Sequence, residues 1–292
     1  MKISPFDSGL MNRHEAELED FRRLHSLEVF SVGATPVPYY DTGGDSAAII
    51  VLHGASQNAE YAFRRILQLK DGFRVVAPTV NRFRSLDELG WGLSGLMDAL
   101  GIERAHVLGG SFGGMIAQAF FRRHRARIDN LVLGFTVPPL PEYGRLFKAV
   151  RLLLNAVPEG ILKKLTKKEL LKMFISDPAL PAETKELLEF YRTYFLFMLW
   201  SVMTKRDLMG QYRLAVEFNA RESYRPENFA DHRGRILIAT SKDDPSFKHH
   251  ERLKAQFPGP EELIFEGGGH VGALVHEDEY MRRVKAFLGG SE

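Results

Sequence analysis

The sequence contains no cysteine among its 292 residues. Disulfides, thiolate metal sites and cysteine nucleophiles are therefore excluded, and the composition is compatible with a reducing cytosol. Long apolar runs are missing too, because the longest, at residues 194–203, includes a serine and falls short of the roughly 20 residues that span a bilayer. The first twenty residues turn acidic where a secretion signal would be apolar. We therefore expect a cytoplasmic protein without a membrane span.

An excess of charge of one sign is also lacking. The 39 basic and 37 acidic side chains leave a formal net charge of only +2, so no overall field selects nucleic acid or an anionic membrane as a partner. A small-molecule substrate, neutral or amphipathic, is the expected partner, and a homodimer is left open. With 45% hydrophobic residues the chain can bury one large core.

Short apolar runs alternate with helical patterns along the chain. Apolar β-branched runs predict strands, and apolar residues three and four apart predict helices. The predicted strands are 47–52, 73–77, 105–108, 131–135, 235–239 and 262–265, and the predicted helices are 59–69, 86–100, 113–124, 248–256 and 277–288. This alternation is typical of a mostly parallel sheet covered by helices on both faces, so the predicted class is α/β.

The alternation breaks after Val137, where a proline-rich stretch opens a segment of nearly pure helical pattern. We interpret residues 138–230 as a helical cap inserted into a core formed by residues 1–137 and 231–292. Apolar and aromatic residues crowd one part of this cap. They are typical of core packing, yet one face of the helix can also wall an apolar pocket. The pocket candidates are Phe195, Met198 and Leu199.

Ser111 lies in the sequence Gly-Gly-Ser-Phe-Gly between a predicted strand and a predicted helix. The G-x-S-x-G spacing suits a nucleophile in a strained turn, because glycines without Cβ atoms let the strand and the helix approach closely. A Gly-rich or phosphate-binding turn is the alternative, but strand, turn and helix are all predicted in place. Ser111 is therefore the predicted nucleophile, and the backbone N–H of Phe112 is a predicted oxyanion donor.

His53 and Gly54 end the predicted strand at residues 47–52. A loop after such a strand has free backbone amides, and we assign the second oxyanion donor to the backbone N–H of Ala55. We expect His53 to be structural, with its ring bonded to backbone, because a catalytic base should follow the acid in the chain.

Two adjacent carboxylates, Asp243 and Asp244, follow the predicted strand at 235–239. They belong at the carboxyl edge of the sheet, where open α/β sheets gather their sites. Asp244 is favoured as the catalytic acid, since Pro245 restricts it to extended geometry. The reverse assignment stays open, with Asp243 otherwise a solvated or turn-capping residue.

His270 follows a predicted strand and three glycines, which suit a loop that carries an imidazole to the serine. It is the predicted base. The remaining histidines lie in polar segments, inside a strand or at predicted surface positions, the last including His250 and His276. No H-E-x-x-H, ligand cluster or G-x-G-x-x-G pattern is present, so we predict neither a metal nor a cofactor.

Together, His53-Gly54, the Ser111 motif, Asp244-Pro245 and Gly269-His270 resemble the α/β-hydrolase superfamily over nearly the whole chain. The resemblance implies a Ser-Asp-His triad, with hydrolysis of an ester or of a related acyl compound, including a carbon–carbon bond. The local sequence of residues 63–139 and the long cap also resemble the maspardin-type proteins, which are better regarded as binding or adaptor proteins.

Two hypotheses follow. The first is a serine hydrolase that acts through an acyl-enzyme on a small carboxylic ester or related acyl substrate with an apolar group. The second is a non-catalytic binding protein on the same fold. A complete triad of Ser111, Asp244 and His270 favours the enzyme, because in a non-catalytic protein drift would be expected to erase at least one member of a unit whose parts work only together.

Overall fold

A single mixed sheet organises the chain. The computed structural model describes residues 13–174 and 179–289, so the parts of the predicted core at 1–12 and 290–292 lie outside the described residues. Within the described ranges, eight strands pair in the order β1-β2-β4-β3-β5-β6-β7-β8. The strands are β1 (Glu28–Val32), β2 (Thr35–Asp41), β3 (Ala48–Leu52), β4 (Arg74–Pro78), β5 (Ala105–Gly110), β6 (Ile128–Gly134), β7 (Ile236–Ser241) and β8 (Glu261–Phe265).

Six of these strands are parallel, from β4 through β3 to β8, whereas β2 runs antiparallel to both β1 and β4. The flanking helices are α1 (Arg13–Leu24), α2 (Phe63–Leu69), α3 (Leu86–Ala99), α4 (Phe112–His124), α9 (His250–Lys254), α10 (Gly272–Val275) and α11 (Glu277–Leu288). The predicted α/β class with a mostly parallel, helix-covered sheet is confirmed.

The continuous apolar runs of the central strands have a simple cause. In β3, Ile50 and Leu52 belong to a core cluster shared with α3 and α4, whereas Ile49 and Val51 belong to a second cluster shared with α1, α2 and α11. Successive side chains of a strand point to opposite faces, so a strand that is buried on both sides must be apolar throughout.

The hairpin of β1 and β2 was not predicted. Its outer strand is largely exposed, and β2 contains Pro36 and Pro38, which weaken the pattern of a strand. Two histidines are also less exposed than predicted. His250 is buried, and His276 is half-buried, with its ring stacked on Phe265 and Nε2 bonded to the carbonyl of Gly267 at 2.8 Å.

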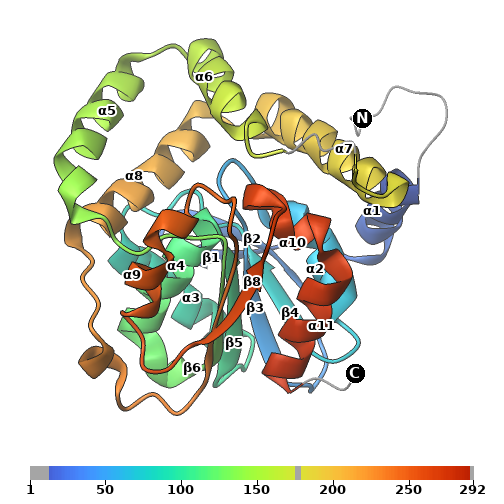
Figure 1. The fold of residues 1–292 in the computed structure, drawn as a ribbon, viewed down its shortest axis with the longest axis vertical. Helices are drawn as coiled ribbons and strands as arrows, with labels where there is room; N and C mark the ends of the chain where they lie inside the picture. Colours follow the sequence, from blue (N-terminus) through green and yellow to red (C-terminus); the bar gives the residue numbers. More distant parts are fainter. Residues whose placement is uncertain (1–12, 175–178, 290–292) are drawn as a thin grey trace.

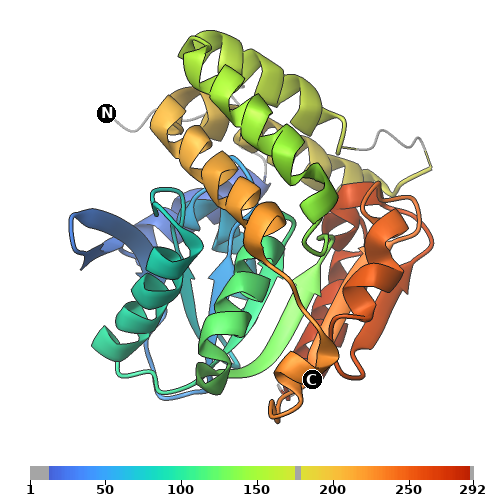
Figure 2. The same cartoon turned by 90° about the vertical axis from the view of Figure 1, so that its left-hand side faces the viewer.

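Between β6 and β7 the chain forms α5 (Gly144–Ala156), α6 (Glu159–Leu171), α7 (Ala182–Phe197), a π-helical turn (Met198–Val202) and α8 (Lys205–Arg221). Figures 1 and 2 show these helices gathered over one end of the sheet, with α5 and α6 outermost. None of the helices in the described ranges is both long and apolar enough to cross a bilayer.

Helix α8 lies directly on the loop after β4. A Cβ atom on Gly210 would lie 1.9 Å from the carbonyl oxygen of Asn81, so only glycine permits this approach. Asp207 anchors the same helix, because its carboxylate caps the helix through Thr204 and pairs with Arg82 at 2.7 Å. The helices between β6 and β7 are thus tied to the sheet next to the loop that follows β3.

His53 holds that loop in place through hydrogen bonds to backbone groups. Its Nε2 accepts a hydrogen bond from the amide of Val80 at 3.1 Å, and its Nδ1 lies 2.9 Å from the carbonyl of Gly54. An amide can only donate and a carbonyl can only accept, so the proton of the neutral ring must be on Nδ1. The structural role predicted for His53 is confirmed. Complete burial lowers the pKa of His53 to about 4, although the bond to Gly54 opposes the shift.

This burial predicts a loss of stability in mild acid. Below the ordinary histidine pKa of about 6.5 the unfolded chain takes up a proton that folded His53 refuses until about pH 4. Stability from this residue is therefore complete near neutral pH and declines as the pH falls between these two values. We expect a contribution of about 2 kcal/mol to be lost between pH 7.5 and pH 5.

Urea denaturation of the wild type and of a His53→Gln variant at both pH values measures this contribution. Carboxylates and other histidines affect both proteins equally, so the wild type should lose about 2 kcal/mol more than the variant over this range. Equal losses would show that His53 is not held neutral by the fold.

Candidate active site

Ser111 occupies a strained turn between β5 and α4. Its backbone has φ 53° and ψ −121°, a conformation that residues other than glycine rarely adopt. Within the described residues, two other non-glycine residues have positive φ, namely Ser56 and Phe135, which follow β3 and β6. The ends of three neighbouring strands thus carry the strained positions, as is common at functional sites.

The glycines of the Ser111 motif meet backbone on two sides. A Cβ on Gly109 would lie 2.3 Å from the carbonyl oxygen of Gly113, and a Cβ on Gly113 would lie 2.3 Å from that of Leu52. Gly110, in contrast, has room, with its nearest neighbour 3.7 Å away. The first and last glycines of the motif are therefore sterically required, because strand β3, the turn and α4 are in direct contact.

His270 connects Ser111 to Asp244. Its Nε2 lies 2.8 Å from Ser111 Oγ, and its Nδ1 lies 3.0 Å and 3.2 Å from the two carboxylate oxygens of Asp244. An ionised carboxylate only accepts, so Nδ1 carries the proton of the neutral ring and Nε2 is free to accept from the serine hydroxyl. The three predicted residues, which come from the ends of β5, β7 and β8, are brought together.

Asp244 is a buried carboxylate that stays ionised. Burial alone would raise its pKa, but hydrogen bonds from His270 and from the amide of Ser246, the latter at 2.7 Å, lower the pKa below its ordinary value. The charge therefore persists throughout the range in which an imidazole accepts a proton.

Asp243 has a different function in the loop. It is exposed, and its Oδ1 accepts a hydrogen bond from the amide of Gly269 at 2.8 Å. Gly268 and Gly269 both have positive φ, and a Cβ on Gly268 would lie 2.9 Å from the backbone of Gly272. The glycine run before His270 thus forms a tight turn, which Asp243 fastens to the end of β7.

The loop after β3 leaves one amide available. The amide of Gly54 donates to Gln57 at 2.7 Å and that of Ser56 donates to Gln211 at 2.6 Å, while the amide of Ala55 between them has no partner in the described part of the chain. Phe112 is the first residue of α4, so its amide has no carbonyl to bind within the helix. Ala55 and Phe112 line one cavity, and Ala55 also lines the cavity that Ser111 and His270 border.

Gln211 is a site residue that the sequence did not indicate. It is a buried residue of α8 that also donates to the side chain of Asn81 at 2.5 Å. Nothing in the sequence of α8, which also contains charged residues, sets Gln211 apart. Its contact with Ser56, 155 residues away, depends on how α8 lies on the sheet.

A cavity of about 200 Å³ contains Ser111 and His270. Its walls are mainly apolar and aromatic, and they include Tyr61, Tyr191 and Phe195. Among the described residues of the lining, Arg65 is the only arginine or lysine. Its guanidinium already binds Glu277, at 3.1 Å, and the carbonyl of Ala273, at 2.7 Å.

A second cavity, of about 380 Å³, lies beneath α5, α6 and α8. It is lined by Ala55, Ser56 and Phe112 and by residues of the three helices, which are mostly apolar but include Thr166, Glu169 and Gln211. Of the predicted pocket residues, Phe195 lines the first cavity. Met198 and Leu199 line neither of these two cavities and are fully buried in hydrophobic clusters.

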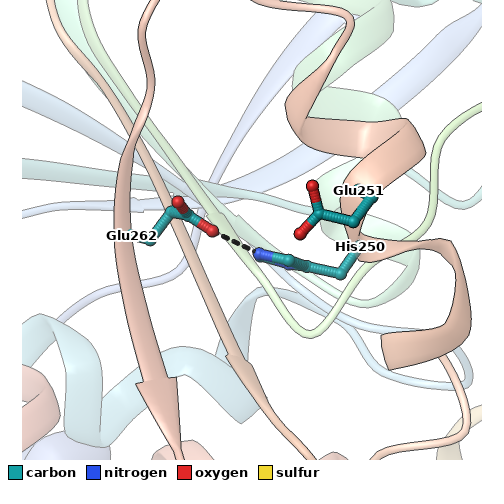
Figure 3. Close-up of side chains that lie close together, drawn as sticks. All are labelled: His250, Glu251 and Glu262. Atoms are coloured by element: carbon teal, nitrogen blue, oxygen red, sulfur yellow. Dashed lines mark hydrogen bonds and ion pairs between the residues drawn. The ribbon is translucent and has the colours of Figure 1, made fainter.

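One group of side chains in the described ranges has the spacing of metal ligands. It comprises His250, Glu251 and Glu262, drawn in Figure 3. His250 Nε2 lies 2.6 Å from a Glu262 carboxylate oxygen, and the other oxygen of Glu262 pairs with Lys254. Both carboxylate oxygens of Glu262 are thus already occupied, and none of the three residues lines the cavity of Ser111.

The sequence is similar to hydrolases from several bacteria. The chain is 26% identical over 286 residues to a 2-hydroxy-6-oxononadienedioate/2-hydroxy-6-oxononatrienedioate hydrolase of Paraburkholderia phymatum, covering 87% of this chain and 91% of that one. A hydrolase of the same name from Pseudomonas putida is 27% identical, with 94% and 97% covered.

Solved structures share the fold. A hydrolase from Pseudomonas aeruginosa PA01 superimposes with a TM-score of 0.71 at 19% identity, covering 92% of this chain and all of that one. An enol-lactonase from Burkholderia xenovorans LB400 gives 0.70 at 17% identity, with 90% of this chain and all of that one covered. A sequence model described as "Alpha/beta hydrolase family" matches residues 49–286. The chain therefore belongs to the alpha/beta hydrolase family of enzymes.

Proposed function

We propose that the protein is a serine hydrolase that cleaves a carboxylic ester, or a related acyl compound with an apolar group, through an acyl-enzyme. The observation that carries this proposal is the unbroken series of contacts from Ser111 Oγ through His270 to Asp244, at 2.8 Å and 3.0 Å. In this scheme Ser111 is the nucleophile, His270 the general base, and Asp244 the acid that orients the imidazole.

In the first half of the reaction, Ser111 attacks the substrate carbonyl while His270 Nε2 takes the hydroxyl proton. Asp244 stabilises the imidazolium that forms and holds the proton on Nδ1. The negative charge develops on the former carbonyl oxygen, where the amides of Ala55 and Phe112 would receive it. The bonds that Gln57 and Gln211 make to the neighbouring amides support this role, because they hold the loop in place before substrate binds.

His270 then gives its proton to the leaving group as the bond from the carbonyl carbon to that group breaks, and the acyl group stays on Ser111. In the second half, water takes the place of the leaving group and attacks the acyl carbon while His270 accepts its proton. The bond from that carbon to Ser111 Oγ breaks, His270 returns the proton to Oγ, and the carboxylic acid leaves. No step requires a further ionisable group.

The lining of the cavities supports an uncharged, apolar substrate group. Tyr61, Tyr191 and Phe195 offer apolar surface beside Ser111, and the guanidinium of Arg65 is already bound by Glu277. A substrate carboxylate would have to compete with that ion pair. We therefore favour esters of monocarboxylic acids over substrates with two carboxylates.

Carbon–carbon bond hydrolysis is the second candidate, and the names of the relatives favour it. Those relatives are hydrolases of 2-hydroxy-6-oxononadienedioate, and a shorter match, 33% identical over 109 residues, is a 2-hydroxy-6-oxo-6-phenylhexa-2,4-dienoate hydrolase. The phenyl compound has one carboxylate and an apolar end, so it suits this cavity better than the dioates do.

The nucleophile is tested by Ser111→Ala on p-nitrophenyl esters from acetate to palmitate. We expect the variant to lose turnover down to the residual level of roughly 10³ to 10⁴-fold over water that binding and oxyanion donors supply alone. Ser223→Ala, at an exposed serine, is the matched control and should keep the wild-type rate.

Turnover by Ser111→Ala at the wild-type rate would exclude Ser111 as the nucleophile. An inert wild-type protein, on these esters and on the phenyl dienoate alike, would instead favour the alternative of a non-catalytic binding protein of maspardin type.

The acid is tested by a pair of matched substitutions. Asp244→Asn keeps the size of the side chain but favours the wrong tautomer of His270, so we expect kcat to fall by at least about a hundredfold. Asp243→Asn should stay within about threefold of the wild type, because an amide oxygen can still accept from Gly269. Measuring kcat of both variants on one activated ester decides between them, and the opposite ranking would move the acid role to Asp243.

A further inference from the structure

Positive charge is concentrated on two helices at the outer end of the molecule. Residues 144–172, which form α5, α6 and their link, contain eight basic and two acidic residues. The whole chain has a net charge of only +2, so the rest of it is net negative. The small overall charge therefore conceals a strongly basic surface, which we call the α5–α6 face.

Most of these cations lack a counterion. Within the described ranges, Lys148, Arg151, Lys164, Lys167 and Lys168 take part in no ion pair and no side-chain hydrogen bond. Arginines elsewhere, such as Arg64 and Arg123, bind two carboxylates each. Charges that the fold does not neutralise are available to an anionic partner.

The same face exposes large apolar side chains. Leu146, Leu152 and Leu153 of α5 are 58%, 68% and 69% exposed, and Ile161 and Leu165 of α6 are also exposed. Trp200, in the π-helical turn next to α6, is partly exposed as well, and its carbonyl binds Lys163 at 3.2 Å. Figures 1 and 2 show α5 and α6 at the outer edge of the molecule, with no helix or strand beyond them.

Leucines and an indole beside unpaired lysines match one kind of surface. In the interface of a lipid bilayer, apolar side chains enter the acyl boundary while lysines and arginines meet anionic headgroups. Nucleic acid would use the cations but leave the leucines in water. A second copy of the α5–α6 face would bury the leucines but oppose like charges. We propose that the α5–α6 face docks the protein onto an anionic lipid bilayer.

The position of the second cavity indicates how docking would serve catalysis, an argument that rests on the proposed function. Val150 and Leu154, on the inner side of α5, line the cavity that also contains Ala55 and Phe112. Leu165 both lines that cavity and is exposed on the α5–α6 face. A bilayer at this face would lie at an opening of the cavity, so an amphiphilic ester could enter with its apolar chain first.

The test is sedimentation of the full chain with vesicles, carried out with Ser111→Ala protein so that hydrolysis does not interfere. We expect at least about tenfold tighter binding to phosphatidylcholine vesicles with about one third phosphatidylserine than to pure phosphatidylcholine, and loss of this preference in about 1 M salt. Equal binding to both vesicles, or binding to neither, would overturn the proposal.

Matched variants locate the surface. Lys164→Glu with Lys168→Glu should weaken binding to the anionic vesicles at least about tenfold, whereas Arg282→Glu with Arg283→Glu, on α11, should not. Leu153→Ser should weaken binding several-fold, whereas Leu24→Ser, at a leucine of α1 that is 66% exposed, should not. Similar effects of test and control variants would contradict the assignment to this face.

Three further readouts keep the outcomes separate. All four variants, made in the otherwise wild-type chain, should hydrolyse a water-soluble ester at the wild-type rate, because none of the substituted residues lines a described cavity. Dimerisation that Leu153→Ser abolishes, or displacement of vesicles by DNA, would replace the bilayer with another partner. An inactive wild-type enzyme that still binds vesicles would contradict the proposed hydrolysis and leave the docking intact.

Discussion

The contact between the end of β3 and the start of α4 is the constraint on which the site depends. The carbonyl of Leu52 comes so close to Gly113 that no side chain fits between them. This contact forces the chain through a sharp turn at Ser111, with φ 53°, and leaves the first amide of α4 without a helical partner. It also places the loop after β3 next to the serine, so that Ala55 and Phe112 border one cavity.

The remaining parts of the site are held by bonds from two directions. From the sheet, Asp243 fastens the turn that carries His270, and Asp244 fixes the orientation of the imidazole itself. From the helices between β6 and β7, Gln211 accepts a hydrogen bond from the amide of Ser56 in the loop after β3. His53 supports the same loop by accepting a hydrogen bond from the amide of Val80. These hydrogen bonds hold the loop after β3, the turn before His270 and the imidazole in place around the strained serine.

The sequence predicted the core of this fold well, because buried parallel strands and their turns leave strong local patterns. The six predicted strands and five predicted helices match observed elements within a few residues. The hairpin of β1 and β2 lacked such a pattern, since its outer strand is exposed and Pro36 and Pro38 interrupt the other. The proximity of Ser111, Asp244 and His270 could be predicted because each of these residues follows a strand. Parallel strands end at the same edge of a sheet, so residues that follow them lie close together.

What the sequence could not supply were contacts that depend on how the helices dock. Gln211 binds a loop 155 residues away, and nothing local to α8 indicates that partner. The apolar stretch that includes Phe195, Met198 and Leu199 has no local feature that separates the side facing the cavity from the side facing the core. The sequence also shows the basic residues of α5 and α6, but only the structure shows which of them have an ion-pair partner.

An activated Ser111 is the central claim, and reaction with a fluorophosphonate tests it most directly. Such a reagent phosphonylates a serine whose proton a neighbouring base removes, irrespective of the natural substrate. Mass spectrometry of the intact protein and of its peptides should find one label per chain on Ser111, and no label on Ser111→Ala. A folded wild-type protein that stays unlabelled, or that carries the label on another residue, would contradict the account.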